Sequence, residues 1–163
     1  MHLVVAARTA PNRAVRFGGE HDDLDSRGRR DAAALASRLP RAGRVIAGPE
    51  RSVTQTARLA CGLFGVDPRL ASLDVGRWRS TAPESVDPAQ LGAWFGDPLW
   101  SGHGGESVGA FVGRIRGVLA ALAAGGPATL VVAGPVAQAV LCEDAASFFA
   151  ADVCPGGLYT VTL

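Results

Sequence analysis

The stretch LVVAARTAPN, residues 3–12, begins with a short apolar run and then turns at once into a polar segment. Such a run, followed by turn-forming residues, predicts a buried strand over residues 3–6. In an α/β protein, ligands bind at the carboxyl ends of the strands. The segment after this strand is therefore a candidate site, although Val5, Ala6 and Ala7 at the strand end carry no reactive group.

The rest of the chain alternates between predicted strands and predicted helices. Asp25 or Ser26 caps the first helix, and Asp87 with Pro88 forms a cap and first-turn pair for a short one. The alternation predicts one α/β domain over residues 1–163, built as a three-layer α/β/α sandwich with a mostly parallel central sheet. The predicted strands are 3–6, 44–47, 69–75, 129–134 and 158–163, and the predicted helices are 25–39, 52–65, 87–95, 106–124 and 135–149.

The segment 80–105 differs from this pattern, because it is rich in proline and glycine around a single short helix. Long segments with little regular structure inside a compact domain are often active-site lids or insertions. We therefore predict a lid or insertion around residues 80–105.

Composition sets the broad class of the protein. A chain of 163 residues with 48% hydrophobic and 19% charged residues fits a globular domain with a real core. The net charge of +1 gives no general reason to expect nucleic acid or a membrane surface as a partner. All 16 basic residues are arginines, which we attribute mainly to the composition of a bacterial-type genome and less to anion recognition.

The expected location is the cytoplasm. No secretory signal is visible, and no apolar run approaches the ~20 residues that span a bilayer. The three cysteines are odd in number and follow no pattern, which is typical of proteins from a reduced compartment.

Five segments, in this order, cover nearly the whole chain and together resemble the histidine phosphatase superfamily, whose fold is called phosphoglycerate mutase-like. The family motifs are Arg-His-Gly-x-Thr with a later Asn, then Ser-Pro-x-x-Arg-Ala-x-Gln-Thr-Ala, then a Glu four residues before the Gly of a Gly-x-Trp turn. The resemblance implies the α/β sandwich of that family. The matching segments are LVVAARTAPN (3–12), AGPERSVTQTA (47–57), RLASLDVGRW (69–78), HGGESVGAFVGRIR (103–116) and VVAGPVAQAVL (131–141).

The first and last motifs lack both histidines of that family. Thr9 and Asn12 fix the register of the first motif, so the nucleophilic histidine falls on Ala6 and the arginine before it on Val5. By alignment of the helix that follows the strand in the last segment, the second histidine falls on Ala133.

The two middle motifs lack the catalytic arginine and the acid. Residues 55–57, Gln-Thr-Ala, fix the second motif and place the arginine on Ser52. Gly76 and Trp78 fix the third motif and place the acid on Ser72. The motif residues that remain are expected to maintain the fold; they are Thr9, Asn12, Gln55, Thr56, Gly76 and Trp78.

These five changes remove the groups on which the family's chemistry depends. The resemblance implies a histidine nucleophile, positive groups around the phosphate, and an acid that protonates the leaving oxygen. The sequence therefore predicts a catalytically degenerate protein, a pseudophosphatase, with a binding or regulatory role and no catalytic residues. Two alternatives stay open: an enzyme of altered chemistry acting on a small metabolite in the remodelled cleft, and a weak residual phosphatase.

The predicted ligand or partner is an unknown small molecule or protein, with a homodimer as one option and with no cofactor or metal. Arg8 would restore some positive charge, whereas Ser52 and Ser72 would donate hydrogen bonds or simply fill space. The candidate binding residues are Ala6, Arg8, Thr9, Asn12, Arg51, Ser52, Ser72, His103 and Ala133.

His103 allows two interpretations. It is the one histidine expected near the cleft, and a Ser-His-acid arrangement with Ser52 or Ser72 and with Asp74 or Glu106 is conceivable. In the other interpretation it is a loop residue before a helix whose amino end Glu106 stabilises. The acidic run GEHDDLD, residues 19–25, lacks a regular ligand spacing, so we do not predict a metal site there.

Overall fold

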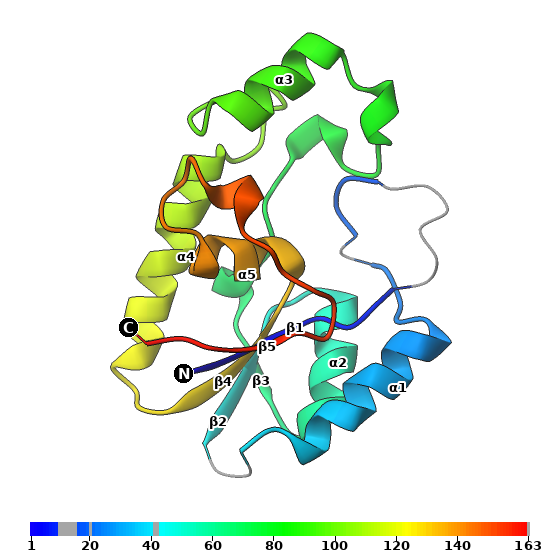
Figure 1. Ribbon diagram of the computed structural model, residues 1–163, viewed down its shortest axis with the longest axis vertical. Coiled ribbons are helices and arrows are strands. Elements are labelled where there is room, and N and C mark those ends of the chain that lie inside the picture. The colour runs from blue at the N-terminus through cyan, green and yellow to red at the C-terminus, as the bar shows by residue number, and fades with distance from the viewer. Residues whose placement is uncertain (10–15, 20, 41–42, 163) are drawn as a thin grey trace.

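The computed structural model describes residues 1–9, 16–19, 21–40 and 43–162. Within these residues five strands form a single sheet in the order β3-β2-β4-β1-β5 (Figure 1). Every neighbouring pair is parallel except β1 with the edge strand β5, which is antiparallel. The strands are β1 (His2–Val5), β2 (Arg44–Ala47), β3 (Gly65–Val66), β4 (Ala128–Val132) and β5 (Leu158–Thr160).

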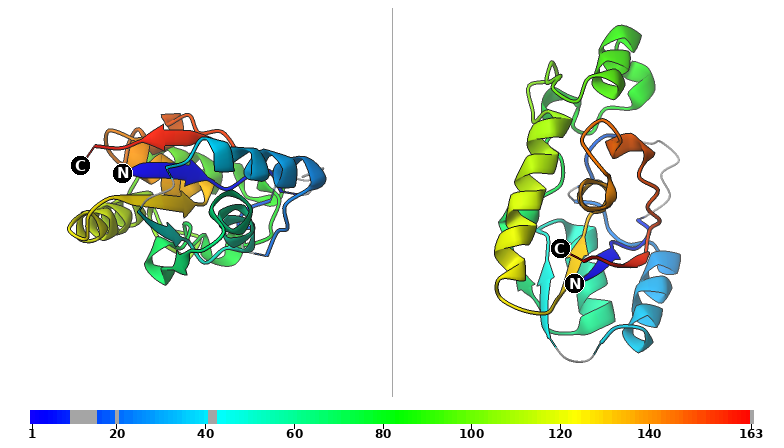
Figure 2. Two further views of the ribbon diagram at one scale, coloured as in Figure 1. Left: turned by 90° about the horizontal axis from the view of Figure 1, so that it is seen from below. Right: turned by 60° about the vertical axis from the view of Figure 1, so that its left-hand side comes forward.

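Helices cover both faces of the sheet, as the views in Figure 2 show. Along β1, Leu3 and Val5 belong to the core cluster formed with α4 (Val108–Ala123) and α5 (Gly134–Leu141). Val4, between them, belongs to the cluster on the other face, with residues of α2 (Arg51–Cys61) and of the turn after α1 (Ser26–Ala34). Because successive side chains of a strand point to opposite faces, a sheet with helices on both faces needs apolar residues at every position. The predicted three-layer sandwich is confirmed.

The remaining helices have the bounds α1 (Ser26–Ala34), α2 (Arg51–Cys61) and α3 (Pro88–Gly96). The Asp25 carboxylate accepts a hydrogen bond from Gly28 N at 2.6 Å and so caps α1. The Asp87 carboxylate caps α3 in the same way, with Pro88 as the first helical residue. Both caps agree with the prediction, since an acidic N-cap followed by an apolar-periodic run is a local signal.

One predicted strand and the ends of two predicted helices are wrong. Residues 69–75 do not form a strand: Pro68–Leu70 is a 3₁₀ turn, and the sheet gains only the two residues of β3. The helix predicted over 52–65 ends at Cys61, because Gly62 adopts a φ of +79°. The helix predicted over 135–149 ends at Leu141, and the chain then loops to a second 3₁₀ turn at Phe148–Ala150. Turns such as these depend on local geometry more than on apolar periodicity.

The strand register brings the chain segments of the predicted site together. Val5 lies opposite Val132, and Ala6 N donates to Val132 O at 2.8 Å just beyond the end of β1. Gly48 N, just after β2, donates to Val131 O at 2.9 Å. Three parallel strands therefore end at one edge of the sheet, below α3 in Figure 1. In the described part of the chain, no helix combines the length and apolar character that crossing a membrane requires.

Candidate functional site

A cavity of about 580 Å³ opens at the carboxyl ends of β1 and β4. Its floor is formed by the two alanines that follow these strands, Ala6 and Ala133, and by Val5. Helix α2 contributes Ser52 near its amino end, and the chain after β3 contributes Ser72. All five positions that the resemblance assigns to phosphatase groups thus line one cavity, and all five side chains are small and uncharged.

Six of the nine predicted binding residues line this cavity. Arg8 lies at its rim, where its guanidinium binds the Asp25 carboxylate at 2.9 Å and stays half-exposed. Asn12 lies outside the described residues. The six are Ala6, Arg8, Thr9, Ser52, Ser72 and Ala133.

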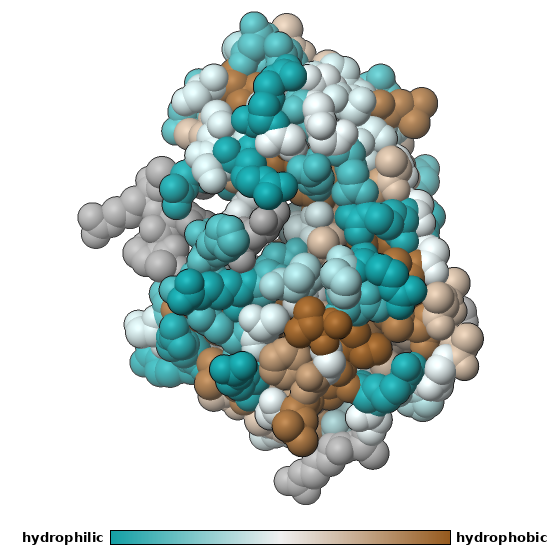
Figure 3. Space-filling model, turned by 180° about the vertical axis from the view of Figure 1, so that it is seen from behind, coloured by the Kyte–Doolittle hydropathy of each residue, from teal (hydrophilic) through white to brown (hydrophobic). Residues whose placement is uncertain are grey.

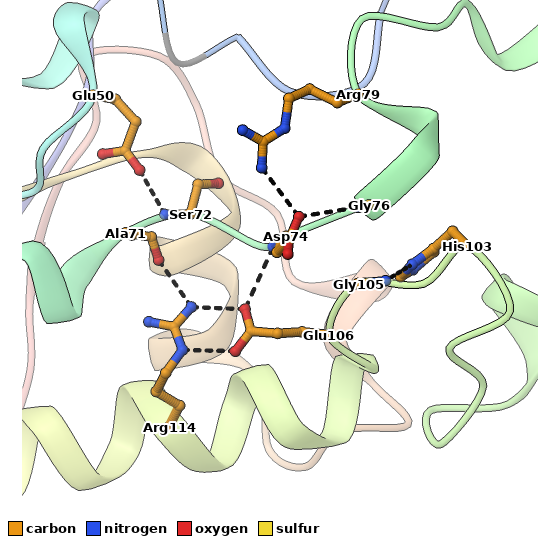
Figure 4. A network of polar contacts seen from close by, with 10 residues as sticks. All are labelled: Glu50, Ala71, Ser72, Asp74, Gly76, Arg79, His103, Gly105, Glu106 and Arg114. Atoms are coloured by element: carbon orange, nitrogen blue, oxygen red, sulfur yellow. Dashed lines mark hydrogen bonds and ion pairs between the residues drawn. The ribbon is translucent and has the colours of Figure 1, made fainter.

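Glu50 lines this cavity as well, and it was not among the residues predicted from the sequence. Glu50 is the residue before α2, yet its side chain does not cap that helix. Its Oε1 instead accepts a hydrogen bond from Ser72 N at 2.5 Å, and the side chain is almost fully buried (Figure 4). The available signal was its position between the end of β2 and the start of α2, which is where this fold class places ligands.

An ion pair holds the segment that carries Ser72 (Figure 4). The Arg114 guanidinium, on α4, binds the Glu106 carboxylate at 2.7 and 2.8 Å. The same guanidinium donates to the carbonyl oxygens of Arg69 at 2.7 Å and Ala71 at 3.1 Å. The adjacent Glu106 carboxylate raises the pKa of Arg114. Side-chain contacts from α4 therefore replace the sheet hydrogen bonds that this extended segment lacks.

The next turn, at Asp74 and Gly76, is fixed by a charged hydrogen-bond acceptor. The Asp74 carboxylate accepts from Gly76 N at 3.0 Å and from the Arg79 guanidinium at 3.1 Å. These contacts, the Gly76 N–H first, hold the pKa of Asp74 below its usual range. Gly76 has a φ of +51°, and a Cβ there would lie 2.3 Å from His103 O. A glycine is required at this position by both the backbone angle and the close approach.

The retained motif residues of α2 tie the end of β1 to that helix, as predicted for residues that maintain the fold. The buried Thr56 hydroxyl accepts from Ala7 N at 3.0 Å and donates to Ser52 O at 2.8 Å. The Gln55 amide oxygen accepts from Leu24 N at 2.9 Å, and its NH₂ group donates to the Asp23 carboxylate. Buried backbone groups need such partners, so these side chains have a structural role that does not depend on catalysis.

Aromatic rings form one side of the cavity, and one of them, Trp94, belongs to the predicted lid. Trp94 comes from α3, whereas Phe17 and Phe149 come from segments far apart in the sequence. The Trp94 ring lies 5.5 Å from that of Phe17 and 4.7 Å from that of Phe149, both edge-on. Phe148 also lines the cavity. We call Phe17, Trp94, Phe148 and Phe149 the aromatic wall. These rings lie outside the segments that carry the motifs, so the motifs did not predict the aromatic wall.

His103 does not line the cavity, which corrects its place among the predicted binding residues. It is 1% exposed and lies among the rings of Trp78, Trp94 and Trp100, at centroid distances of 5.0, 6.4 and 5.3 Å. Its Nδ1 accepts from Gly105 N at 3.0 Å, and burial lowers its pKa.

The conceivable Ser-His-acid arrangement is therefore not formed. His103 lies within the predicted lid segment and packs among aromatic rings, and the Glu106 carboxylate binds Arg114. The two candidate serines line a cavity that His103 does not reach.

Arg51 also lies outside the cavity lining, which corrects a second predicted binding residue. Its side chain is 58% exposed and binds the Asp23 carboxylate at 2.8 Å. Asp23 and Asp25 are thus used to hold α1 and α2 rather than a cation. Within the described residues, no group of three or more His, Cys, Asp or Glu side chains is arranged to hold a metal ion.

The three-layer fold and the cavity at the strand ends define an α/β protein of the phosphoglycerate mutase-like class. The chain belongs to the histidine phosphatase superfamily (branch 1), whose family model matches residues 1–152. A search of the curated proteins finds no match.

Solved structures of this class resemble the chain over most of its length. The protein TTHB049 from Thermus thermophilus is 28% identical, with 96% of this chain and 89% of that chain covered and a TM-score of 0.80. A mycobacterial glucosyl-3-phosphoglycerate phosphatase in complex with VO3 is 26% identical, with coverage of 97% and 90% and a TM-score of 0.81. A protein named mycobacterial hydrolase 1, at 24% identity, 97% and 88% coverage and a TM-score of 0.82, shares the fold.

Proposed function

We propose that this protein is a catalytically degenerate member of the histidine phosphatase superfamily that binds a small molecule in the cavity without hydrolysing phosphate esters. The observation that carries the proposal is that Ala6 and Ala133, to which the motif register assigns the two histidine positions, both line the cavity. The regulatory or binding role follows from a cavity whose volume falls within the range of small-molecule sites.

Physical chemistry supports the absence of phosphoryl transfer at this floor. Transfer through a phosphohistidine needs a nucleophilic imidazole and positive groups around the equatorial oxygens. Alanine supplies neither, and Ser52 and Ser72 supply no charge. The loss of a single preorganised donor costs a factor of about 10²–10³ in rate, so five losses leave no effective route.

We expect no hydrolysis of p-nitrophenyl phosphate or of sugar phosphates above the rate without protein. Release of inorganic phosphate measures this, with the mycobacterial glucosyl-3-phosphoglycerate phosphatase assayed in parallel as the active reference. The Ala6→Gly variant should release phosphate at the same background rate, because residue 6 supplies no catalytic group. Hydrolysis of a phosphate ester that persists through purification, and that is slower in the Ser52→Ala variant, would contradict the proposal and favour a weak residual phosphatase.

The second candidate function is an enzyme of altered chemistry acting on a small metabolite. Polar groups that line the cavity favour it, among them Arg8, Ser52, Ser72 and Gln138. Incubation of the protein with a metabolite extract, followed by mass spectrometry, separates the two candidates. Protein-dependent loss of one compound supports an enzyme, whereas a raised melting temperature without consumption supports a binding protein.

We also propose that the protein works as a homodimer in the cytoplasm. Among the described residues, the edge strand β3 has no sheet neighbour on one side; its own Val66 is 53% exposed, and Leu63 just before it is 91% exposed. Figure 3 views the molecule from this side of the sheet and shows apolar side chains gathered over its lower half. An edge strand can pair with its own copy across a two-fold axis, which makes the contact self-complementary.

Leu63→Arg together with Val66→Lys is expected to convert a dimer into a monomer, because the charges would be buried without partners at the two-fold contact. Light scattering after size-exclusion chromatography gives the mass directly. Leu99→Arg is the matched control, since Leu99 is 77% exposed but lies beyond α3, in the predicted lid. A monomeric mass for the unmodified chain at high concentration would refute the dimer.

A further inference from the structure

We propose that the cavity binds an uncharged aromatic compound that carries a carbonyl oxygen, with its ring against the aromatic wall and its oxygen at the first turn of α2. This inference rests on the proposed function, because it names the chemical class of the ligand for the same cavity. Three features of the described residues carry it: the pairing of the charges around the cavity, a buried serine hydroxyl without a protein partner, and the rings on one side.

The buried charge of the cavity is already compensated. Glu50, which is 5% exposed, accepts a hydrogen bond from Ser72 N and has a further interaction besides. The Arg114 guanidinium also faces it, since the pKa of Arg114 is raised first by the hydrogen bond to Glu106 and also by the charges of Glu106 and Glu50. A charged ligand beside this carboxylate would compete with these contacts, whereas an uncharged ligand leaves them in place.

The arginines of the lining lie at the exposed rim. Arg8 binds Asp25 at 2.9 Å, and Arg79 binds Asp74 at 3.1 Å. Both guanidiniums are half-exposed, so water screens the charge of any group that approaches them. A charged ligand therefore gains little at the rim. The other titratable residues of the lining, which lie in the segment before α1 and are exposed or half-buried, are Arg16, His21 and Asp22.

A buried hydroxyl in the cavity lining has no partner in the described part of the protein. Ser52 lies in the first turn of α2 and is 7% exposed, and among the described residues its hydroxyl makes no hydrogen bond. The side chain of the N-cap residue, Glu50, does not cap α2, so the first-turn N–H groups lack that acceptor as well. Buried polar groups are normally hydrogen-bonded. An oxygen atom of a ligand would supply the missing partner.

The donors at this turn favour a carbonyl oxygen over an anion. The positive end of the helix dipole attracts an oxygen that carries a partial negative charge. A buried full negative charge would also need a cation beside it, and the Arg114 guanidinium already faces the carboxylates of Glu106 and Glu50. A carbonyl oxygen accepts hydrogen bonds without that requirement.

The aromatic wall suits the ring of such a compound. The Trp94 ring packs edge-on with that of Phe149 at 4.7 Å and with that of Phe17 at 5.5 Å. A further ring can join such a cluster edge-on or in an offset stack. Ala6 and Ala133 have small side chains, and the cavity volume of about 580 Å³ has room for a compound of one or two rings.

The experiment uses four probes of nearly equal shape: acetophenone, ethylbenzene, benzoate and benzamidine. Titration of the purified protein, followed by tryptophan fluorescence and by ligand-observed NMR, gives their affinities. Acetophenone is expected to bind more tightly than either charged probe, because benzoate and benzamidine would lose hydration without gaining an unpaired partner charge. Ethylbenzene has the shape of acetophenone without its oxygen, so it serves as the reference ligand for the variants.

Ser52→Ala should weaken acetophenone about three- to tenfold and leave ethylbenzene nearly unchanged, because the variant removes one hydrogen-bond donor. The matched control is Ser85→Ala, which removes a hydroxyl from an exposed position outside the cavity lining and should change no affinity. Phe149→Ala tests the wall separately and should weaken acetophenone and ethylbenzene together. It also keeps the inference testable if Ser52→Ala does not fold.

Two results would overturn the inference: benzoate or benzamidine binding as tightly as acetophenone, or acetophenone binding that Ser52→Ala leaves unchanged. These failures differ from failure of the proposed function. Hydrolysis of phosphate esters would refute the function itself, whereas the absence of both hydrolysis and acetophenone binding would refute the ligand class alone.

Discussion

A variant with the phosphatase groups rebuilt at the cavity floor is expected to hydrolyse p-nitrophenyl phosphate at least about a thousandfold faster than the unmodified chain. The five positions line one cavity, and the helices and strands that carry them keep the family arrangement. The expected gain in rate is large because these groups act as a unit. For the same reason, restoring any one of these side chains alone should give little activity. The variant carries Val5→Arg, Ala6→His, Ser52→Arg, Ser72→Glu, Ala133→His and Glu50→Gln.

The sixth substitution follows from the position of Glu50. Its Oε1 lies 2.5 Å from Ser72 N, so a new glutamate at position 72 would begin next to an existing carboxylate. Two carboxylates at one site raise the pKa of one of them and repel a phosphate dianion. The five-residue variant that keeps Glu50 should therefore be at least about tenfold slower than the six-residue one.

The measurement is the initial rate of phosphate release by each purified variant, with circular dichroism and a melting curve to establish folding. Replacing the new histidine at position 6 by alanine again is the control and should abolish the gained activity. A folded six-residue variant without activity would mean that the cavity differs from a phosphatase site in shape as well as in its reactive groups.

Gly28→Ala is expected to lower the free energy of unfolding by about 2–3 kcal/mol. Gly28 lies in the first turn of α1, and a Cβ there would lie 2.0 Å from Arg8 O and 2.9 Å from Arg8 C. Both atoms belong to the backbone just after β1, so neither can move aside as a flexible side chain would. The helix or the cavity rim must shift, and Arg8 should shift with it.

Gly113→Ala is the matched control, because this glycine is also helical but has no atom within 4 Å of a Cβ. There the alanine only raises helix propensity, so stability should increase by about 0.5–1 kcal/mol. Urea unfolding followed by tryptophan fluorescence measures both variants. Equal effects of the two substitutions would show that α1 does not pack against the residue-8 backbone as described.

Local patterns predicted the regular elements well. The apolar runs gave β1, β2 and β4 to within one or two residues, and the 3.6-residue periodicity gave α4 at Val108–Ala123 against a predicted 106–124. Acid caps at Asp25 and Asp87 marked two helix starts. Such signals lie within a few residues of the element that they define. The strand predicted over residues 69–75 was wrong. The hydrogen-bond partners of this segment come from α4, which lies far along the chain.

The candidate site was likewise predictable only in part from the sequence. The motif register in the sequence predicted that Ala6, Ser52, Ser72 and Ala133 would meet, and they line one cavity. The register could not show that His103 would be buried among three tryptophans, since that depends on how the segment 80–105 folds back. Both alternatives for His103 placed it in a loop, but its burial follows from ring packing with distant residues.

The sequence by itself determined the class of fold and predicted that the phosphatase groups are absent, because periodicity and motif spacing are properties of neighbouring residues. Only the tertiary structure decided the charge and the walls of the cavity. The Glu50 carboxylate points away from its own helix toward Ser72, and the aromatic wall joins rings from segments far apart in the chain, such as Phe17 and Phe149. Such contacts form when the sheet brings distant segments together and water is excluded from the core between them. No local sequence pattern indicates which segments will meet.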